Sequence, residues 1–458
     1  MNKLKVTFPQ HEDKIDTIMK KLFCSVSLIF IIWNLSAQKN DSLKSTQEEI
    51  IKTGWNFGAV PAIAYDSDIG FKYGGVVNFY HYGDGSTYPK YLHSVYLEWS
   101  RTTKGSGINQ FIYDSEYLIP GIRVTGEASL LTEKALDFYG FNGYKAYYDA
   151  AYEDDESNDY ISRMYYRHER MLTRLKLDLQ GKIREQKIRW LGGLVHYGIK
   201  IDSVDIENLN EGLDEAELLP DTSLLYNQFV NYGIIPEKQA DGGNTNFLKL
   251  GLVYDTRDNE PNPMQGIWTE MLFLAAPAFL GNDYSFTRLA ITHRQYFTLI
   301  PKDLNLAYRV SYQGKLSGEM PFYMLPFVYN SDITRDGLGG AKTIRGVLRN
   351  RVVGEDFLYH NLELRWKFFR TLIMKQNFYF ALNTFLDGGV VINNYDFNTN
   401  QAPANFFEKQ DSEGYHLSYG AGLHIAMNQN FVVACNYGRA FDPRDGNSGL
   451  YIGLNFLF

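Results

Sequence analysis

The sequence predicts an all-β protein, an antiparallel transmembrane β-barrel of about 16 strands. Apolar and polar residues alternate with a period of two through most of the chain, as in strands with one apolar and one polar face. The chain has 34 tyrosines and 30 phenylalanines, although its mean hydropathy is only -0.30. Barrels combine these properties because aromatic residues form girdles at both membrane interfaces. Soluble all-β proteins can share this composition, so the prediction depends mainly on the alternation and on the gaps between strands.

Residues 1–37 resemble a leader that contains a signal peptide. Lys20 and Lys21 form a basic start, an apolar run of about 12 residues follows over 22–33, and a Leu-Ser-Ala sequence provides a cleavage site. The apolar run is too short to cross a bilayer as a helix, and the alternative is a short buried helix. The residues before Met19 are polar and mixed in charge, so Met19 is a candidate for the true start.

The rest of the chain is interpreted as one barrel with a short segment in front of it. Residues 38–53 are polar and are assigned to a short periplasmic segment, and residues 54–458 are assigned to the barrel. No linker or shift in composition indicates a second domain. No other apolar stretch reaches about 18 residues, so membrane-spanning helices are not expected.

Sixteen alternating runs can be read along the chain, and an even number of strands is usual in bacterial single-chain barrels. The predicted strands lie near 54–65, 69–81, 91–102, 106–118, 121–131, 164–182, 187–202, 246–256, 265–276, 285–297, 303–316, 356–369, 376–388, 414–427, 430–440 and 448–458.

The sixth run shows the pattern most clearly. One face carries Met171, Thr173, Leu175, Leu177 and Leu179, and the opposite face carries Leu172, Arg174, Lys176, Asp178 and Gln180. A barrel needs this arrangement because lipid contacts one face and a wet lumen contacts the other. A β-sandwich also alternates, but it would rarely place Arg, Lys and Asp together opposite a continuous leucine stripe.

Along the chain, long gaps between the runs alternate with short gaps. If the first gap faces outward, the outer loops include the long segments 132–163, 203–245, 317–355 and 389–413. Most gaps on the other side are tight turns, such as Ile119-Pro120. Long outer loops and short periplasmic turns are typical of outer-membrane barrels.

A group of residues in the C-terminal third carries a resemblance to a known family. The group consists of Ile344, Arg345, Gly346 and Val347 in a long gap, Glu363 on the next run and Asp387 on the run after it. It resembles the BamA/TamA superfamily of outer-membrane assembly and translocation barrels (the bacterial surface antigen domain). That family has a sixteen-stranded barrel whose sixth outer loop carries a Val/Ile-Arg-Gly-Phe/Tyr motif and folds into the lumen. Val347 replaces the usual aromatic residue.

The resemblance implies that Arg345 holds this loop inside the barrel, with Glu363 and Asp387 as its partners in the lumen. Alternation agrees, because it places both carboxylates on the lumen faces of neighbouring strands. A guanidinium among carboxylates can form bidentate, charge-assisted hydrogen bonds. Gly346 would let the loop backbone pass close to the wall. The alternative is an exposed arginine in a mobile loop.

Two further motifs extend the resemblance. Asp255, Arg257 and Asp258, followed by Gly266, resemble the family's periplasmic turn between strands eight and nine. The last run resembles a barrel-recognition signal with alternating apolar residues on one face, namely Leu450, Ile452, Leu454, Phe456 and Phe458. Alternatively, it is simply the last lipid-facing strand, which needs the same residues.

The expected function is to aid the insertion, export or assembly of a protein or lipid client in the outer membrane of a Gram-negative bacterium. Expected partners are outer-membrane lipids and a separate periplasmic or membrane protein. Assembly members of the family carry POTRA domains, for which this sequence has no room, so it resembles the members that lack them. Gly54, Gly58 and Pro61 would weaken pairing of the first strand and allow a loose seam with the last. The alternative function is a passive pore or a structural barrel without assembly activity.

No enzymatic, cofactor, metal or nucleic-acid site is expected. The histidines are scattered without metal-ligand spacing, and His360 and His424 are predicted on outward faces. No cysteine or serine occupies a convincing nucleophile position. The formal net charge of -8 and the lack of a basic cluster exclude nucleic-acid binding.

Overall fold

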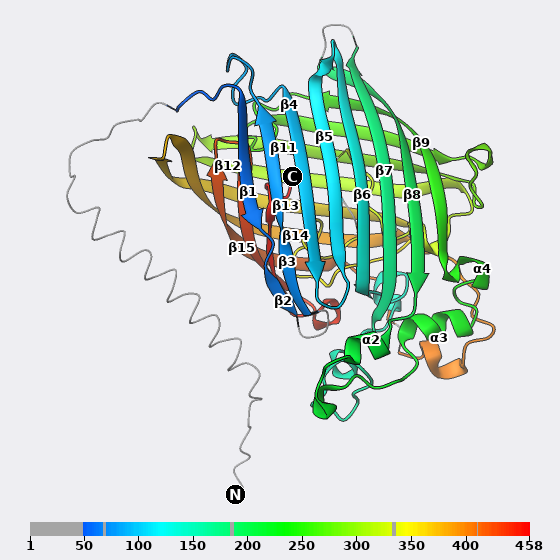
Figure 1. The fold of residues 1–458 in the computed structure, drawn as a ribbon. Coiled ribbons are helices and arrows are strands. Elements are labelled where there is room, and N and C mark those ends of the chain that lie inside the picture. The colour runs from blue at the N-terminus through cyan, green and yellow to red at the C-terminus, as the bar shows by residue number, and fades with distance from the viewer. Residues whose placement is uncertain (1–48, 67–69, 184–186, 332–335, 410) are drawn as a thin grey trace, which may run out of the picture. The chain divides into compact units, whose positions relative to one another are not determined.

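The alternating runs form strands in the computed structural model, which describes residues 49–66, 70–183, 187–331, 336–409 and 411–458. Residues 50–458 make one unit, built on a single antiparallel sheet of 17 strand segments. The sheet curls so that the strands of the first half of the chain face those of the second half (Figure 1). The curl gives the sheet an inner face and an outer face.

The strand bounds agree with the predicted runs to within a few residues at most ends. The first half contains β1 (Trp55–Pro61), β2 (Ala64–Asp66), β3 (Gly70–His81), β4 (His93–Thr102), β5 (Gly107–Ile119), β6 (Ile122–Asp137), β7 (Arg167–Lys182), β8 (Ile188–Asp202) and β9 (Gly242–Asp255). The second half contains β10 (Gly266–Ala276), β11 (Phe286–Ile300), β12 (Leu304–Gly318), β13 (Asp356–Ile373), β14 (Gln376–Asn393), β15 (His416–Met427), β16 (Phe431–Ala440) and β17 (Ser448–Leu454).

The first two segments act as one interrupted strand. Both β1 and β2 pair with β3, and the register that pairs Pro61 with Gly75 continues to pair Ala64 with Lys72. The interruption follows Pro61, which cannot donate a backbone hydrogen bond. Counted in this way the wall has sixteen strands, and the predicted fold class is confirmed.

Burial alternates along the strands as the sequence predicts. On β7, Arg174 and Asp178 are buried, whereas Leu175 and Leu177 are exposed on the other side. The buried charges pair across the inner face, where Arg174 contacts Glu127 at 2.5 Å. The outer face is therefore apolar and the inner face is charged and hydrogen-bonded, as a membrane barrel requires.

The two ends of the sheet differ. At one end, which we call the short-turn end, tight turns such as 374–375 and 428–430 join the strands. At the other, the long-loop end, long segments carry the helices α2 (Ile206–Asn210), α3 (Leu225–Asn231) and α4 (Glu237–Ala240). It also carries the 3-10 turns η1 (Gly143–Lys145), η2 (Ala150–Tyr152), η3 (Glu215–Glu217), η4 (Ala278–Leu280), η5 (Phe322–Met324), η6 (Ala404–Phe407) and η7 (Pro443–Asp445). None of the helices in the described part of the chain has the length and apolar character needed to cross a membrane.

Aromatic side chains from several long loops pack into one cluster at the long-loop end. Phe138 and Phe141 lie edge to face with Phe229 of α3, and Phe141 also contacts Phe322 and Tyr395. We call this cluster the aromatic dome. It ties together loops that are far apart in the sequence.

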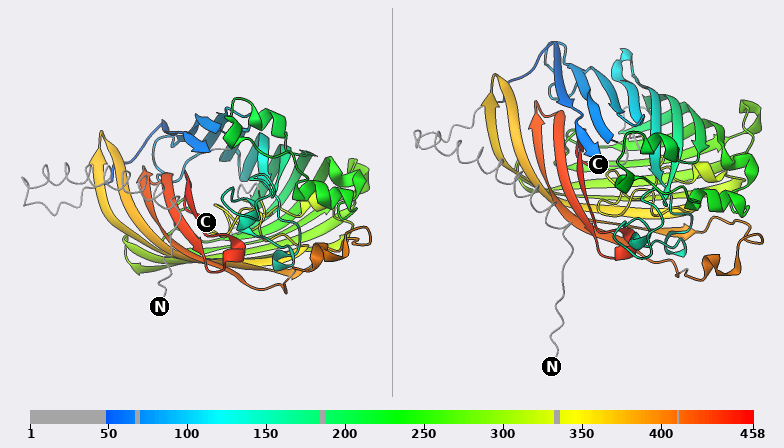
Figure 2. Two further views of the ribbon diagram at one scale, coloured as in Figure 1. Left: turned by 90° about the horizontal axis from the view of Figure 1, so that it is seen from below. Right: turned by 60° about the horizontal axis from the view of Figure 1, so that its bottom comes forward.

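The sheet has a seam where its two end strands meet. Among the described residues, no strand register and no backbone hydrogen bond joins β17 to β1 or β2. Figure 2 shows the first and last strands at the two ends of the curled sheet. Within the part of the chain that the structure describes, the register of β17 is with β16, where Cys435 lies opposite Ile452. The seam therefore has unpaired strand edges on both sides.

Side chains bridge the seam at the short-turn end. The ring of Phe431, at the start of β16, covers Gly58 of β1 so closely that a Cβ on Gly58 would lie 2.3 Å from its Cγ. Tyr80 and Tyr82 complete a buried cluster around Phe431, with Leu454 of β17 packed against it. Packing therefore holds the two end strands together here in place of backbone pairing.

Candidate functional site

Arg345 lies at the centre of a buried ion-pair cluster against the inner face of the sheet. Its Nε lies 2.8 Å from Asp387 Oδ2 and its Nη2 lies 3.0 Å from Oδ1 of the same carboxylate. Its Nη1 lies 2.7 Å from Glu363 Oε1. The side chain of Arg345 is 1% exposed, and those of both carboxylates are 0% exposed. One guanidinium thus joins β13 and β14 through two carboxylates.

The two strands position these carboxylates by alternation and register. Asp387 of β14 pairs with Asn361 of β13, and Glu363 pairs with Phe385. The four side chains consequently lie next to one another on the inner face. The ring of Phe385 lies 3.5 Å from the guanidinium carbon of Arg345, close enough for a cation–π contact. Charge pairing and stacking therefore fix the plane of this guanidinium.

Gly346 brings the loop into direct contact with β16 and β17. Its φ of 96° favours glycine, and a Cβ would lie 2.5 Å from the backbone nitrogen of Arg439. Gly438 on β16 faces it, since a Cβ there would lie 2.7 Å from the carbonyl carbon of Arg345. The amide of Gly346 donates to Tyr451 Oη on β17 at 2.9 Å. The loop backbone therefore packs against the last two strands of the wall.

The apolar members of the motif are buried beside the charged cluster. Ile344 is 0% exposed and Val347 is 1% exposed. Both pack in a cluster with Leu338 and Val352 of the same loop and with Phe357 of β13. A valine thus fills the place where the resemblance expects an aromatic residue.

Four buried side chains lie beside the cluster but do not belong to the predicted motif around Arg345. Glu363 also accepts a hydrogen bond from Arg365 Nε at 2.6 Å, so one carboxylate serves two guanidinium groups. Arg365 in turn lies over the rings of Phe456 and Phe458, at 4.6 and 4.8 Å. His424 lies 4.4 Å from the ring of Phe456. Alternation along its strand places Arg365 on the inner face, but no sequence signal places the two aromatic rings there.

The last strand is shorter than predicted. β17 ends at Leu454, and Asn455 has a φ of 67°, which turns the chain away from the wall. Leu450 and Ile452 are exposed on the outer face as predicted, but Phe456 and Phe458 are 5% and 7% exposed. The prediction that all five alternating residues share an outward face is therefore wrong for these two, because the cation–π contacts with Arg365 compensate for leaving the strand.

The predicted outward position of His424 is also wrong. The side chain is 1% exposed and its Nε2 lies 3.3 Å from Asn436 Oδ1 on the neighbouring strand. The alternation of β15 places its even-numbered residues on the inner face, as the burial of His416 and Ser418 shows. His360, in contrast, contacts Tyr415 in an exposed position.

The residues of the predicted turn motif lie together between β9 and β10. Arg257 makes a two-pronged ion pair with Asp255, at 3.0 Å for both hydrogen bonds, and stacks 4.0 Å from the ring of Trp268. Asp258 accepts hydrogen bonds from the amides of Met264 and Gln265. Gly266 has a φ of 109°, and a Cβ there would lie 2.4 Å from the carbonyl oxygen of Thr256.

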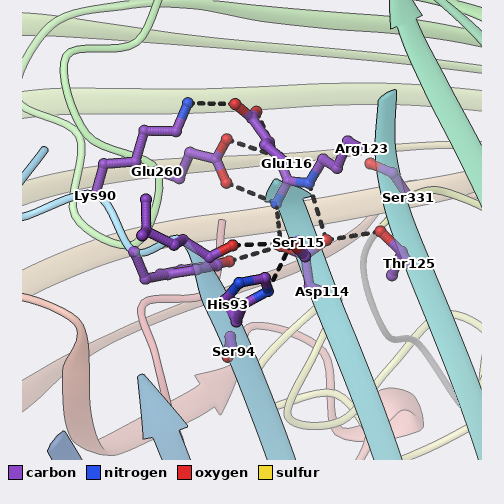
Figure 3. Close-up of polar contacts among 12 residues, drawn as sticks. Lys90, His93, Ser94, Asp114, Ser115, Glu116, Arg123, Thr125, Glu260 and Ser331 are labelled. Atoms are coloured by element: carbon purple, nitrogen blue, oxygen red, sulfur yellow. Dashed lines mark hydrogen bonds and ion pairs between the residues drawn. The ribbon is translucent and has the colours of Figure 1, made fainter. Parts of the chain in front are cut away.

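The same turn reaches across the short-turn end of the sheet. Glu260 makes two hydrogen bonds to Arg123 of β6, at 2.7 and 2.9 Å. Arg123 also makes two hydrogen bonds to Asp114 of β5, and Figure 3 shows it between the two carboxylates. On the other side, Asn305 of β12 donates to the carbonyl of Pro263. Residues 256–265, which we call the β9–β10 turn, therefore connect opposite parts of the wall.

Replacing Glu260 by glutamine is expected to loosen the β9–β10 turn by about 1–3 kcal/mol, because the pair with Arg123 loses its charge. Burial opposes ionisation of Glu260, but Arg123 and Arg257 outweigh this effect and hold its pKa far below the usual range. A lowered pKa means that the pair contributes fully above about pH 4.5 and is lost as the pH falls through the lowered value. Hydrogen exchange of residues 256–265 would measure both effects.

The exposed pair of Asp303, in the turn between β11 and β12, and Arg370, near the end of β13, provides the control. Asp303 is 45% exposed, and Asp303→Asn should leave exchange in the β9–β10 turn unchanged. Equal exchange in wild type and Glu260→Gln at pH 7 would contradict the proposed role of the pair.

Comparisons with known proteins agree with this architecture. A model of the Omp85 superfamily domain matches residues 139–456. CdiB from Escherichia coli is similar in structure, with a TM-score of 0.52, 13% identity, and coverage of 89% of this chain and 64% of that chain. BamA from Haemophilus ducreyi lacking POTRA domains 1-3 gives a TM-score of 0.46 with 14% identity, and covers 88% of this chain and 69% of that chain. A search of the curated proteins gives no match. The chain spans about two thirds of the length of these two solved structures.

Proposed function

Because this chain belongs to the Omp85 superfamily of Gram-negative outer-membrane β-barrels, we propose that it aids the insertion, export or assembly of a protein or lipid client. One observation carries the proposal. The motif that pairs Arg345 with Glu363 and Asp387 also contacts β16 and β17 through Gly346, beside a seam without backbone pairing. The loop therefore contacts the two strands next to the seam, and its release would change how these strands are held.

We propose that Arg345 locks the loop of residues 319–355 inside the lumen. Three further contacts support this role. Gln313 of β12 exchanges two hydrogen bonds of 2.9 Å with the backbone of Tyr329. Arg349 of the loop pairs with Glu133 of β6. Arg309 of β12 donates to the carbonyl of Lys342. These contacts hold the loop to β6 and β12, which belong to the two halves of the sheet. Releasing Arg345 would therefore free the loop first from β16 and β17, next to the seam.

Three groups of contacts at the inner face and at the two ends favour this proposal over a passive pore. The aromatic dome covers the long-loop end, the 319–355 loop contacts the inner face, and the β9–β10 turn crosses the short-turn end. A client would then leave the lumen sideways, through the seam and into the bilayer. Unpaired strand edges suit this route, because a β-strand entering the seam can pair with them.

The proposal includes partners. A separate periplasmic or membrane protein would deliver the client. Outer-membrane lipids would surround the apolar outer face.

Depletion of this protein is expected to remove a subset of other barrels or surface proteins from the outer membrane. Quantitative proteomics of that membrane would measure the loss. Wild-type protein should restore it, whereas Arg345→Ala should not. The exposed-pair variant Arg370→Ala should restore it fully and thereby controls for expression. An unchanged outer-membrane proteome after depletion would favour the structural barrel or the pore.

A further inference from the structure

A groove on the outer face lies below an arginine at the rim of the sheet. The groove has a volume of about 740 Å³, and its lining includes Leu97, Trp99, Phe111, Ala128, Leu130 and Leu175 from β4 to β7. This volume falls in the range of about 300–1,000 Å³ that is usual for small-molecule sites. Small residues make the hollow, because Ala128 pairs with Phe111 on one side and with Leu175 on the other.

The wall around the groove faces the membrane. Trp99 and Leu175 are each 50% exposed and Phe111 is 44% exposed, so these side chains present apolar surface to lipid. Gly126, the next outward residue on β6, has no atom within 4 Å of the place that a Cβ would occupy. The hollow therefore continues along β6 toward the short-turn end and has the elongated form that an acyl chain needs.

Arg101 is placed at the other end of the groove. It belongs to the outward row of β4 that includes Leu97 and Trp99, two residues beyond Trp99 toward the long-loop end. Its guanidinium carbon lies 5.6 Å from the ring centre of Trp99. A Cβ on Gly107 would lie 2.6 Å from Nη1, so the guanidinium occupies the space that this glycine leaves free. Arg101 is thereby directed along the outer face.

Among the described residues, the hydrogen-bond partners of Arg101 are neutral. Nη1 donates to the carbonyl of Ser100 at 2.8 Å, and Nη2 donates to Asn109 Oδ1 at 2.9 Å. A third, longer contact joins Nη1 to the carbonyl of Ile108 at 3.5 Å. Within the described residues no carboxylate pairs with it, in contrast to Arg123, Arg174 and Arg345. Asn109 also lines the groove, so the cation and the apolar hollow are continuous.

We propose that this surface binds one phosphate-bearing, acylated lipid of the outer leaflet. Because short turns face the periplasm in such barrels, Arg101 lies at the level of the outer headgroups and the groove lies at the level of the acyl chains. A guanidinium binds phosphate with two parallel hydrogen bonds and is only weakly hydrated, which suits a membrane interface. Arg101 holds the headgroup, and the groove holds one acyl chain.

Native mass spectrometry of the full chain in detergent micelles tests the site. The probes are dimyristoyl phosphatidic acid, the matched diacylglycerol without phosphate, and inorganic phosphate as a competitor. Wild type should retain one phosphatidic acid at least tenfold more strongly than diacylglycerol, and inorganic phosphate should not displace it. Arg101→Gln should reduce retention of phosphatidic acid to the level of diacylglycerol. Ala128→Leu, which fills the groove, should reduce retention of both lipids.

Lys200 provides a matched control because it is an exposed cation on the outer face of β8, next to the groove but not part of its lining. Lys200→Gln should bind like wild type. Equal retention of the two lipids by wild type, or unchanged retention by Arg101→Gln, would overturn the proposal. Full displacement by inorganic phosphate would instead identify a site for a free anion and would overturn the assignment to a lipid. A loss that is as large in Lys200→Gln would show nonspecific attraction to the charged rim.

Discussion

Replacing Arg345 by alanine is expected to destabilise the barrel by about 3–5 kcal/mol, because it leaves two buried carboxylates without their shared cation. Glu363 keeps Arg365 as a partner, whereas Asp387 loses both of its ion-pair hydrogen bonds. On electrophoresis, the folded variant should therefore convert to the slow-migrating, unfolded form after heating to a lower temperature than wild type requires. Because the loop would separate from β16 and β17, the variant should also fail to restore function after depletion.

Two other variants make this result specific. Arg345→Lys keeps the charge but lacks the planar fork that bonds to both oxygens of Asp387, so it should give an intermediate loss. Arg370→Ala breaks an ion pair whose side chains are 44% and 45% exposed, and it should change stability by less than about 1 kcal/mol. Unchanged migration together with full activity of Arg345→Ala would contradict a locking role.

Joining the seam by a disulfide is expected to abolish the function if clients leave sideways. Gly58 and Phe431 suit this purpose, since a Cβ on Gly58 would lie 2.3 Å from Cγ of Phe431. The Cβ of Phe431 is one carbon–carbon bond away from that Cγ. The two Cβ atoms would therefore lie within about 4 Å of each other, which matches the usual spacing in a disulfide. A Gly58→Cys, Phe431→Cys protein in a Cys435→Ala background should lose activity when oxidised and recover it with dithiothreitol.

A disulfide inside the wall controls for the chemistry. Thr292 of β11 and Ser311 of β12 are paired, and their hydroxyl oxygens lie 2.9 Å apart. A Thr292→Cys, Ser311→Cys pair in the same background should form readily without loss of activity. Full activity of the oxidised seam variant would exclude lateral opening as a required step, even if the lock variants fail.

The sequence was informative about the wall because alternation is a local property. Each inward residue of β7 could be assigned from its own neighbours, and Glu363 and Asp387 lie on the predicted inner faces for the same reason. The sixteen strands followed from the same pattern. A one-residue shift of register would move the charged side chains to the lipid face and the apolar side chains to the inner face. Such a shift is costly, so the pattern determines which residues of each strand face inward.

Contacts between distant segments could not be predicted in this way. The pair of Glu260 and Arg123 joins residues 137 positions apart, and neither neighbouring sequence distinguishes them from other surface charges. The inward turn after Leu454 was missed because Phe456 and Phe458 continue the alternating pattern. Only the position of Arg365 on another strand explains why these two rings leave the wall. Long-range charge and ring contacts therefore override the local pattern at both places.

The single cysteine of the barrel region offers a spectroscopic use. Cys435 is a free thiol on the strand before the last, directly opposite Ile452 at the edge of the seam. Its neighbours on the same row of β16 point to the outer face, as the exposure of Tyr437 shows. A nitroxide attached there would sense molecular oxygen dissolved in the bilayer and would respond to a strand entering beside it. The native chain can thus be followed by electron paramagnetic resonance during a working cycle without any engineered residue.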